Sequence, residues 1–104
     1  GLQPKIESLR NCLKPLESLP HVGEVRQCGL IAAIELAQEK ATKTPYPWEE
    51  RVGVKVCLEA RRHGLLLRPL AHIMIIMPPL IITPREIEMV VEIVHKSIQV
   101  VTGQ

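Results

Sequence analysis

Aromatic side chains are almost absent from this 104-residue chain, which has one Tyr, one Trp and no Phe. Its core must therefore come from the aliphatic residues that dominate a hydrophobic content of 46%. No apolar run approaches the roughly 20 residues that a membrane-spanning helix needs, so we expect no membrane partner. A chain of this length is sufficient for one small domain, and we expect residues 1–104 to form one.

The sequence also lacks paired cysteines and a cluster of positively charged residues. Cys12, Cys28 and Cys57 are odd in number and form no CxxC, and no signal segment opens the chain, which favours reduced thiols in a cytoplasmic protein. The net charge of +2 comes from cations scattered among acids, which argues against a nucleic-acid partner. The four histidines lack the spacing of zinc ligands, so we predict no metal site.

The apolar pattern of the first half predicts a helix followed by strands. Leucine and isoleucine recur at helical spacing from Leu2 to Leu16, and Pro15 with Pro20 should close that helix. Residues 22–37 are rich in β-branched side chains and are interrupted by Gly29, which predicts two short strands or one bent strand. The polar segment 38–48 is expected to be an exposed connection that Tyr46 and Trp48 hold against the core.

The second half predicts a helix, a strand pair and a last helix. Residues 49–63 favour a helix that Gly64 ends, with an inner face formed by Val52, Val56 and Ala60. Strands are predicted at 65–68 and 73–77, joined by the short connection 69–72. The second of these strands lacks polar alternation, so both of its faces should be covered, one of them by something outside this domain.

A capping box predicts the start of the last helix. Thr83 is placed to cap it, Pro84 occupies its first position and Glu86 its third. Gly103 marks its end. The apolar face of this helix is expected to consist of Ile87, Val90, Val91, Val94, Ile98 and Val101.

Arg68 is the candidate binding residue, because it is one cation between two apolar runs. A guanidinium stays protonated and presents a planar fork of donors, so it requires a carboxylate, a phosphate or solvent. Pro69 restricts the backbone of Arg68 to an extended conformation and limits the direction of its side chain. A structural salt bridge is the alternative explanation for this residue.

Several segments together resemble the C-terminal part of the class III aminotransferases that depend on pyridoxal phosphate. The similar segments are Val25–Leu36, the insert at 40–47, Leu67–Leu70 and Ile76–Leu80. The resemblance is strongest to the biotin-pathway branch, which transfers an amino group onto 8-amino-7-oxononanoate to give 7,8-diaminononanoate. It implies an α+β fold, a small antiparallel sheet with helices packed on one face, like the C-terminal small domain of fold-type I aminotransferases.

The resemblance also implies a division of roles with a longer parent protein, which the start at Gly1 rather than Met likewise leads us to expect. In the family, the arginine that matches Arg68 binds the carboxylate of the keto-acid substrate. The lysine that forms a Schiff base with pyridoxal phosphate belongs to an upstream large domain, and none of the lysines here matches its motif. We therefore expect no catalytic residue, no bound cofactor and no activity in this fragment alone, and a homodimeric parent enzyme.

Three questions stay open from the sequence. The position of Ile75 is a tyrosine in several relatives that take the amino group from S-adenosylmethionine, so the donor is either that compound or lysine. The parent enzyme could instead act on another ω-amino acid or keto acid within the class. The third possibility is a non-catalytic module in which Arg68 captures an anion.

Overall fold

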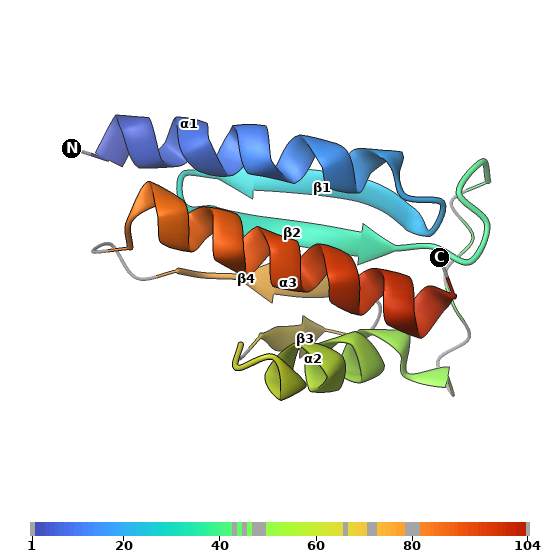
Figure 1. Cartoon of the computed structure of the whole chain (residues 1–104). Helices are drawn as coiled ribbons and strands as arrows, with labels where there is room; N and C mark the ends of the chain where they lie inside the picture. The colour runs from blue at the N-terminus through green and yellow to red at the C-terminus, as the bar shows by residue number, and fades with distance from the viewer. Residues whose placement is uncertain are drawn as a thin grey trace.

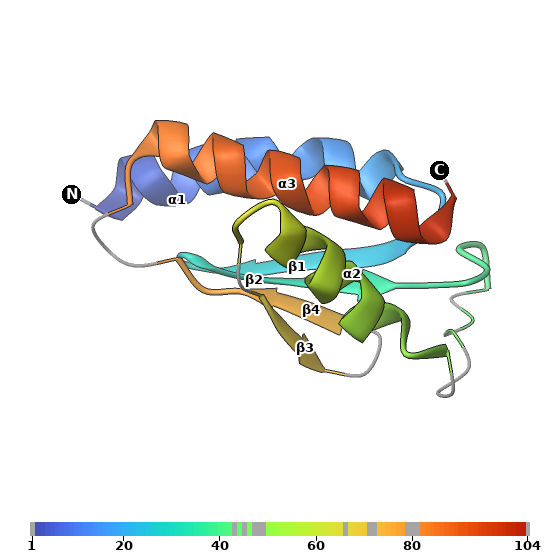
Figure 2. The same cartoon turned by 60° about the horizontal axis from the view of Figure 1, so that its bottom comes forward.

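Four strands form one antiparallel sheet, and three helices lie together on one of its faces (Figures 1 and 2). This computed structural model describes residues 2–42, 44, 46, 50–65, 67–70, 73–78 and 82–103. The strands are β1 (Val22–Cys28), β2 (Ile31–Leu36), β3 (Arg68–Leu70) and β4 (Ile73–Ile76), in the order β1-β2-β4-β3. The helices are α1 (Leu2–Leu13), α2 (Val52–Arg62) and α3 (Pro84–Thr102). The α+β fold with helices on one face is confirmed.

Alternation along the strands gives the sheet two different faces. The covered face, which packs against the helices, carries side chains that are at most 2% exposed: Ala32, Ile34 and Leu36 of β2 with Met74 and Ile76 of β4. The open face carries the intervening residues: Ile31, Ala33 and Glu35 of β2 with Ile73 and Ile75 of β4. None of the three helices lies on the open face (Figure 2).

The first helical segment is divided into an α-helix and a 3-10 helix. The α-helical part stops at Leu13, and a 3-10 helix η1 (Lys14–Ser18) follows, with Pro15 in its first turn. The α-helix ends just before Pro15 and the 3-10 helix ends just before Pro20, so the two prolines close the helical segment as predicted. Pro15 is tolerated in the first turn of η1 because its missing N–H is not needed there. Leu16 is still fully buried, so the expected apolar face continues through the change of helix type.

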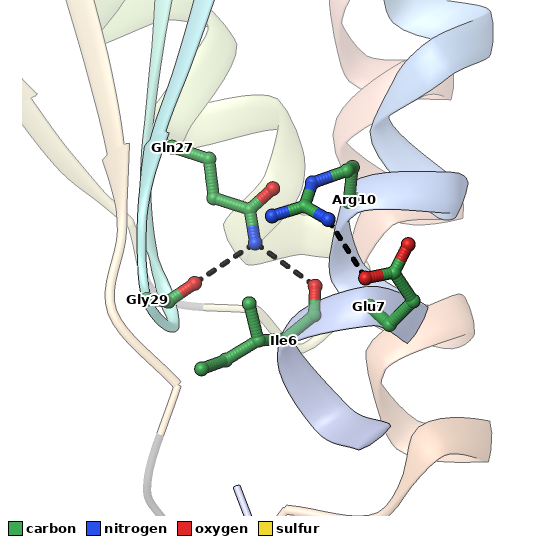
Figure 3. Close-up of polar contacts among 5 residues, drawn as sticks. All are labelled: Ile6, Glu7, Arg10, Gln27 and Gly29. Atoms are coloured by element: carbon green, nitrogen blue, oxygen red, sulfur yellow. Dashed lines mark hydrogen bonds and ion pairs between the residues drawn. The ribbon is translucent and has the colours of Figure 1, made fainter. Parts of the chain in front are cut away.

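The β1–β2 hairpin turns at Gly29, whose φ of 61° lies in the left-handed region that glycine adopts without strain. This confirms two strands rather than one bent strand. Figure 3 shows how Gln27 attaches the hairpin to α1: its amide nitrogen donates to the carbonyl of Gly29 at 2.8 Å and to that of Ile6 at 3.0 Å. One side chain thereby joins the turn of the sheet to the first helix.

The connection after β2 returns toward the core at Tyr46, as predicted. Tyr46 packs against the buried cluster, and its ring centroid lies 6.0 Å from that of His21. Glu39 and Thr44 pair across the loop, and Lys40 donates to the backbone carbonyls of Glu17 and Leu19. The second residue predicted to hold this loop, Trp48, lies outside the described residues.

Helix α2 begins at Val52, two residues after Glu50, rather than at the predicted start of the segment 49–63. Its inner face is confirmed, since Val52, Val56 and Ala60 are at most 5% exposed. Gly64 follows the helix with a φ of 86°, the left-handed conformation expected of a glycine at this position.

The predicted position of the third strand was wrong. The strand is Arg68–Leu70 rather than 65–68, so Pro69 lies within it and not in the connection. Pairing explains the shift, because Pro69 is opposite Met74 on an edge strand, where a missing N–H need not break the ladder. The apolar residues before Arg68 do not determine which residues of this segment pair with β4. The pairing with β4 itself determines that register.

The start of α3 agrees with the predicted capping box. The hydroxyl of Thr83 accepts from the N–H of Glu86 at 3.1 Å, and the Glu86 carboxylate accepts from the N–H of Thr83 at 2.9 Å. Gly103 ends the helix with a φ of 80°. Ile87, Val91, Val94 and Ile98 are at most 5% exposed and form the buried face.

Candidate functional site

Arg68 is the first residue of β3, the edge strand beside β4. It lies opposite Ile75, and because Ile75 is on the open face, so is Arg68. The side chain is exposed. The predicted binding residue therefore stands on the face of the sheet that the helices leave uncovered.

A hollow surrounds this position on the open face. Its volume is about 240 Å³, and it is lined by Leu67, Arg68, Ile75 and Met77. Complete small-molecule sites commonly have volumes of about 300 to 1,000 Å³. This hollow is smaller, as expected of one part of a site that a larger protein completes. Of the described residues that line it, Arg68 is charged and the other three are apolar.

The guanidinium of Arg68 makes no ion pair or hydrogen bond with any of the residues that the structure describes. Arg26 provides the contrast at the other end of the same cross-strand row. Its guanidinium lies 3.1 Å from the carboxylate of Glu24 and 3.8 Å from that of Glu35. Of these two arginines on one face, only Arg26 has the structural ion pair that was the alternative explanation for Arg68.

A second hollow, on the helix side, has the opposite character. It has a volume of about 230 Å³ and is lined by Cys12, Pro15, Glu88, Val91, Glu92 and His95. Burial, together with the nearby Glu88 carboxylate, raises the pKa of the Cys12 thiol. Two carboxylates, with no lysine or arginine among the described lining residues, disfavour an anionic ligand, so the hollow at Arg68 is the better candidate for a carboxylate substrate.

Cysteines and metal-ligating side chains are the remaining candidates for a site in the part of the chain that the structure describes. All three cysteines are free thiols, and burial raises the pKa of Cys57 from 9.0 to about 11. No group of three His, Cys, Asp or Glu side chains is arranged for a metal ion among the described ranges. Within those same ranges, no helix has the length and apolarity to cross a bilayer.

The comparison with protein families decides the assignment. The family profile described as aminotransferase class-III matches residues 2–98. The chain belongs to the class III aminotransferases. This class III chain is 58% identical over 102 residues to the adenosylmethionine-8-amino-7-oxononanoate aminotransferase of Geobacter sulfurreducens. That match covers 98% of the chain but only 22% of the relative, so the chain spans about a fifth of the length of such proteins.

Other relatives show both the fold and the breadth of the class. A crystal structure of adenosylmethionine-8-amino-7-oxononanoate aminotransferase from Methanocaldococcus jannaschii matches with a TM-score of 0.91 and 37% identity, over 94% of this chain and 22% of that one. A PMP-bound aminotransferase from Vibrio fluvialis matches with a TM-score of 0.94 and 25% identity, over 99% of this chain and 23% of that one. A rice (Oryza sativa subsp. indica) protein named gamma-aminobutyrate transaminase 1, mitochondrial, is 38% identical over 78% of this chain and 16% of its own length.

The described residues do not by themselves fit pyridoxal phosphate, the cofactor that the family implies. Such a site requires a lysine for the Schiff base and a cradle for the phosphate. Lys40 is engaged with backbone carbonyls and Lys96 lies 3.8 Å from Glu92. None of the lysines that the structure describes lines the hollow at Arg68.

The sequence predicted Arg68 but not the residues around it. Ile75 was recognised only as the position of a tyrosine in some relatives, and Leu67 and Met77 were interpreted as strand or core residues. What brings them to Arg68 is the register Arg68 opposite Ile75, which depends on how β3 pairs with β4. One feature of the sequence did point to this region: residues 73–77 lack polar alternation, which predicted that something outside the domain covers the second face of the strand.

Proposed function

We propose that this chain is the C-terminal small domain of a cytoplasmic, homodimeric class III aminotransferase in biotin biosynthesis. The parent enzyme transfers an amino group onto 8-amino-7-oxononanoate to give 7,8-diaminononanoate, and Arg68 binds the carboxylate of that keto acid. The observation that carries the proposal is an exposed guanidinium without a partner among the described residues, in a hollow whose other lining residues are apolar.

The names and lengths of the relatives support this division of labour. Both the Geobacter and the Methanocaldococcus relatives carry the name of the biotin-pathway enzyme, and each is more than four times as long as the matched region. We place the large domain with the Schiff-base lysine upstream of residue 1 in the parent enzyme. Pyridoxal phosphate, when bound there, supplies the electron sink for transamination.

We assign Arg68 the role of orienting the substrate, which its exposure in the hollow supports. A carboxylate can accept two parallel hydrogen bonds from the guanidinium fork, and these fix both its distance and its orientation. The apolar neighbours Ile75 and Met77 strengthen this interaction, because they exclude water from one side of the pair. The keto acid is thereby held by the end remote from its reacting carbonyl.

The central experiment uses the complete enzyme and the variant Arg68→Ala. We expect kcat/KM for 8-amino-7-oxononanoate to fall about 30- to 1,000-fold, the equivalent of roughly 2 to 4 kcal/mol for a lost charged partner. Arg26→Ala is the matched control, since it removes an arginine from the same row that is ion-paired to Glu24, and it should leave kcat/KM nearly unchanged. An Arg68→Ala enzyme with wild-type kcat/KM would refute the role of Arg68.

The amino donor is tested in the same assay. Formation of 7,8-diaminononanoate is followed with S-adenosylmethionine or with lysine as the only donor. Ile75 stands where some relatives have a tyrosine, so we propose that either donor is chemically open to this enzyme. The isolated chain should give no product with either donor, because the described residues supply no cofactor lysine to the hollow.

A second candidate is a class III aminotransferase that acts on another ω-amino acid. The rice relative named gamma-aminobutyrate transaminase favours it, although at 38% identity against 58% for the Geobacter protein. A panel with 4-aminobutanoate and 8-amino-7-oxononanoate separates the two. Preference for 4-aminobutanoate would replace the biotin-pathway assignment and leave Arg68 as the carboxylate-binding residue.

A further inference from the structure

The apolar residues that line the hollow at Arg68 bear on which carboxylates the site selects. This inference rests on the proposed carboxylate-binding role of Arg68. Leu67, Ile75 and Met77 line the hollow together with the guanidinium. Arg68 accounts for the binding of a carboxylate but not for the three apolar side chains beside it. Leu67 also packs against the buried core, so Ile75 and Met77 are the two side chains placed to contact whatever is attached to that carboxylate.

Ile75 is the best placed of the three. It lies directly opposite Arg68 across the β3–β4 pair, and directly opposite residues have Cβ atoms about 4.5 to 5.5 Å apart. Its side chain is half-buried on the open face, although no helix covers that face. Met77 follows at the end of the same strand and is 56% exposed.

We propose that Ile75, with Met77, forms an apolar surface that selects carboxylates carried on a straight, unsubstituted aliphatic chain. With the carboxylate on Arg68, the next methylene groups lie against these side chains and lose contact with water, which favours binding. A hydroxyl or ammonium group on the carbon next to the carboxylate would lose hydration without gaining a hydrogen-bond partner there, which disfavours binding. Ile75 is thus a specificity-determining residue, distinct in role from Arg68.

The test measures inhibition of the complete enzyme by butanoate, hexanoate and octanoate, which bind but cannot react. For the wild type we expect the inhibition constant to fall about fourfold for each methylene that packs against the surface. Ile75→Thr keeps the β-branched shape and adds a hydroxyl, and it should reduce the fall to twofold or less. Ile73→Thr is the matched control, because Ile73 is on the same strand and face but does not line the hollow. It should keep the wild-type dependence.

The outcomes separate this inference from the proposed function. Arg68→Ala should raise all three inhibition constants by a similar factor and keep their ratios. If it raises them but Ile75→Thr keeps the wild-type ratio of octanoate to butanoate, the role of Ile75 is refuted and that of Arg68 stands. If Arg68→Ala raises none of them, the assignment of the carboxylate site itself is wrong.

A comparison that needs no variant measures the inhibition of the wild type by hexanoate and by 2-hydroxyhexanoate. Tenfold weaker binding of the hydroxy acid supports the proposal, and equal binding overturns it.

Discussion

The two faces of β2 and β4 are made from the same strands but differ in almost every property. The covered face has Ile34 and Met74 with 0% exposure, beneath three helices. The open face has Ile73 and Ile75, half-buried, with charged residues on both neighbouring strands. Period-two alternation thus lets one short strand contribute to the core on one face and, as we propose, to substrate recognition on the other.

The difference teaches where stability and binding reside in so small a domain. Residues of the covered face contribute by removing apolar area from water, and their loss leaves a cavity. Residues of the open face, Arg68 above all, contribute little to folding, because exposed side chains have few contacts to lose. Substitutions on the two faces should therefore separate unfolding free energy from substrate use.

The largest expected effect is on the covered face. Ile34→Ala should lower the free energy of unfolding by roughly 3 kcal/mol, since a fully buried isoleucine on a central strand leaves a cavity that its neighbours fill only in part. Ile73→Ala, the same substitution on the open face, should cost less than about 1.5 kcal/mol. Urea denaturation followed by circular dichroism measures both. Equal losses would show that the open face is as well packed as the core.

The cysteines give a second, smaller contrast. Cys57 is 8% exposed on the inner side of α2, and its burial raises its pKa from 9.0 to about 11, whereas Cys28 is exposed on the open face of β1. Because only the thiolate reacts, the raised pKa of Cys57 and its burial should both slow its labelling at pH 8. Mass spectrometry during iodoacetamide labelling should find Cys28 modified long before Cys57. Labelling of both at similar rates would contradict the burial of α2 against the sheet.

The smallest effect concerns the cap that begins α3, a helix of the covering layer. The backbone N–H and the hydroxyl of Thr83 lower the pKa of Glu86 from its ordinary 4.5. A lowered folded-state pKa stabilises the fold fully above about pH 4.5, and this contribution is lost as the pH falls through the folded-state value. Glu86→Gln should therefore flatten the decline of stability between pH 5 and 3, as measured by thermal unfolding at each pH. An unaltered pH profile would show that the capping box does not form in solution.

Local signals predicted the elements better than their pairing. The Thr83–Glu86 box and Gly29 each encode a conformation within a few residues, and the structure places both as predicted. The strand at Arg68–Leu70 was misplaced by three residues at its start, because Leu65 to Leu67 are as suited to a strand as Leu70 is. Only contact with β4 decides between these registers, and that contact is far from local.

The same limit applies to the site. Arg68 stays a prediction from its surroundings in the sequence and from the family resemblance. Its neighbours are Ile75 in β4 and Met77 just after it, and no local pattern defines the register of that strand. The link between Gln27 and the carbonyl of Ile6 was missed for a similar reason, since it joins residues 21 positions apart. Residue chemistry could be predicted, whereas the grouping of those residues required the fold.

The most direct test of the central claim compares 8-amino-7-oxononanoate with its analogue in which the carboxylate is replaced by a primary alcohol. In the complete enzyme, we expect kcat/KM to favour the acid by about 30- to 1,000-fold, because the alcohol cannot pair with the Arg68 guanidinium. In the Arg68→Ala enzyme this preference should fall close to one. A preference that survives unchanged in Arg68→Ala would contradict the claim that the open face of this domain recognises the carboxylate through Arg68.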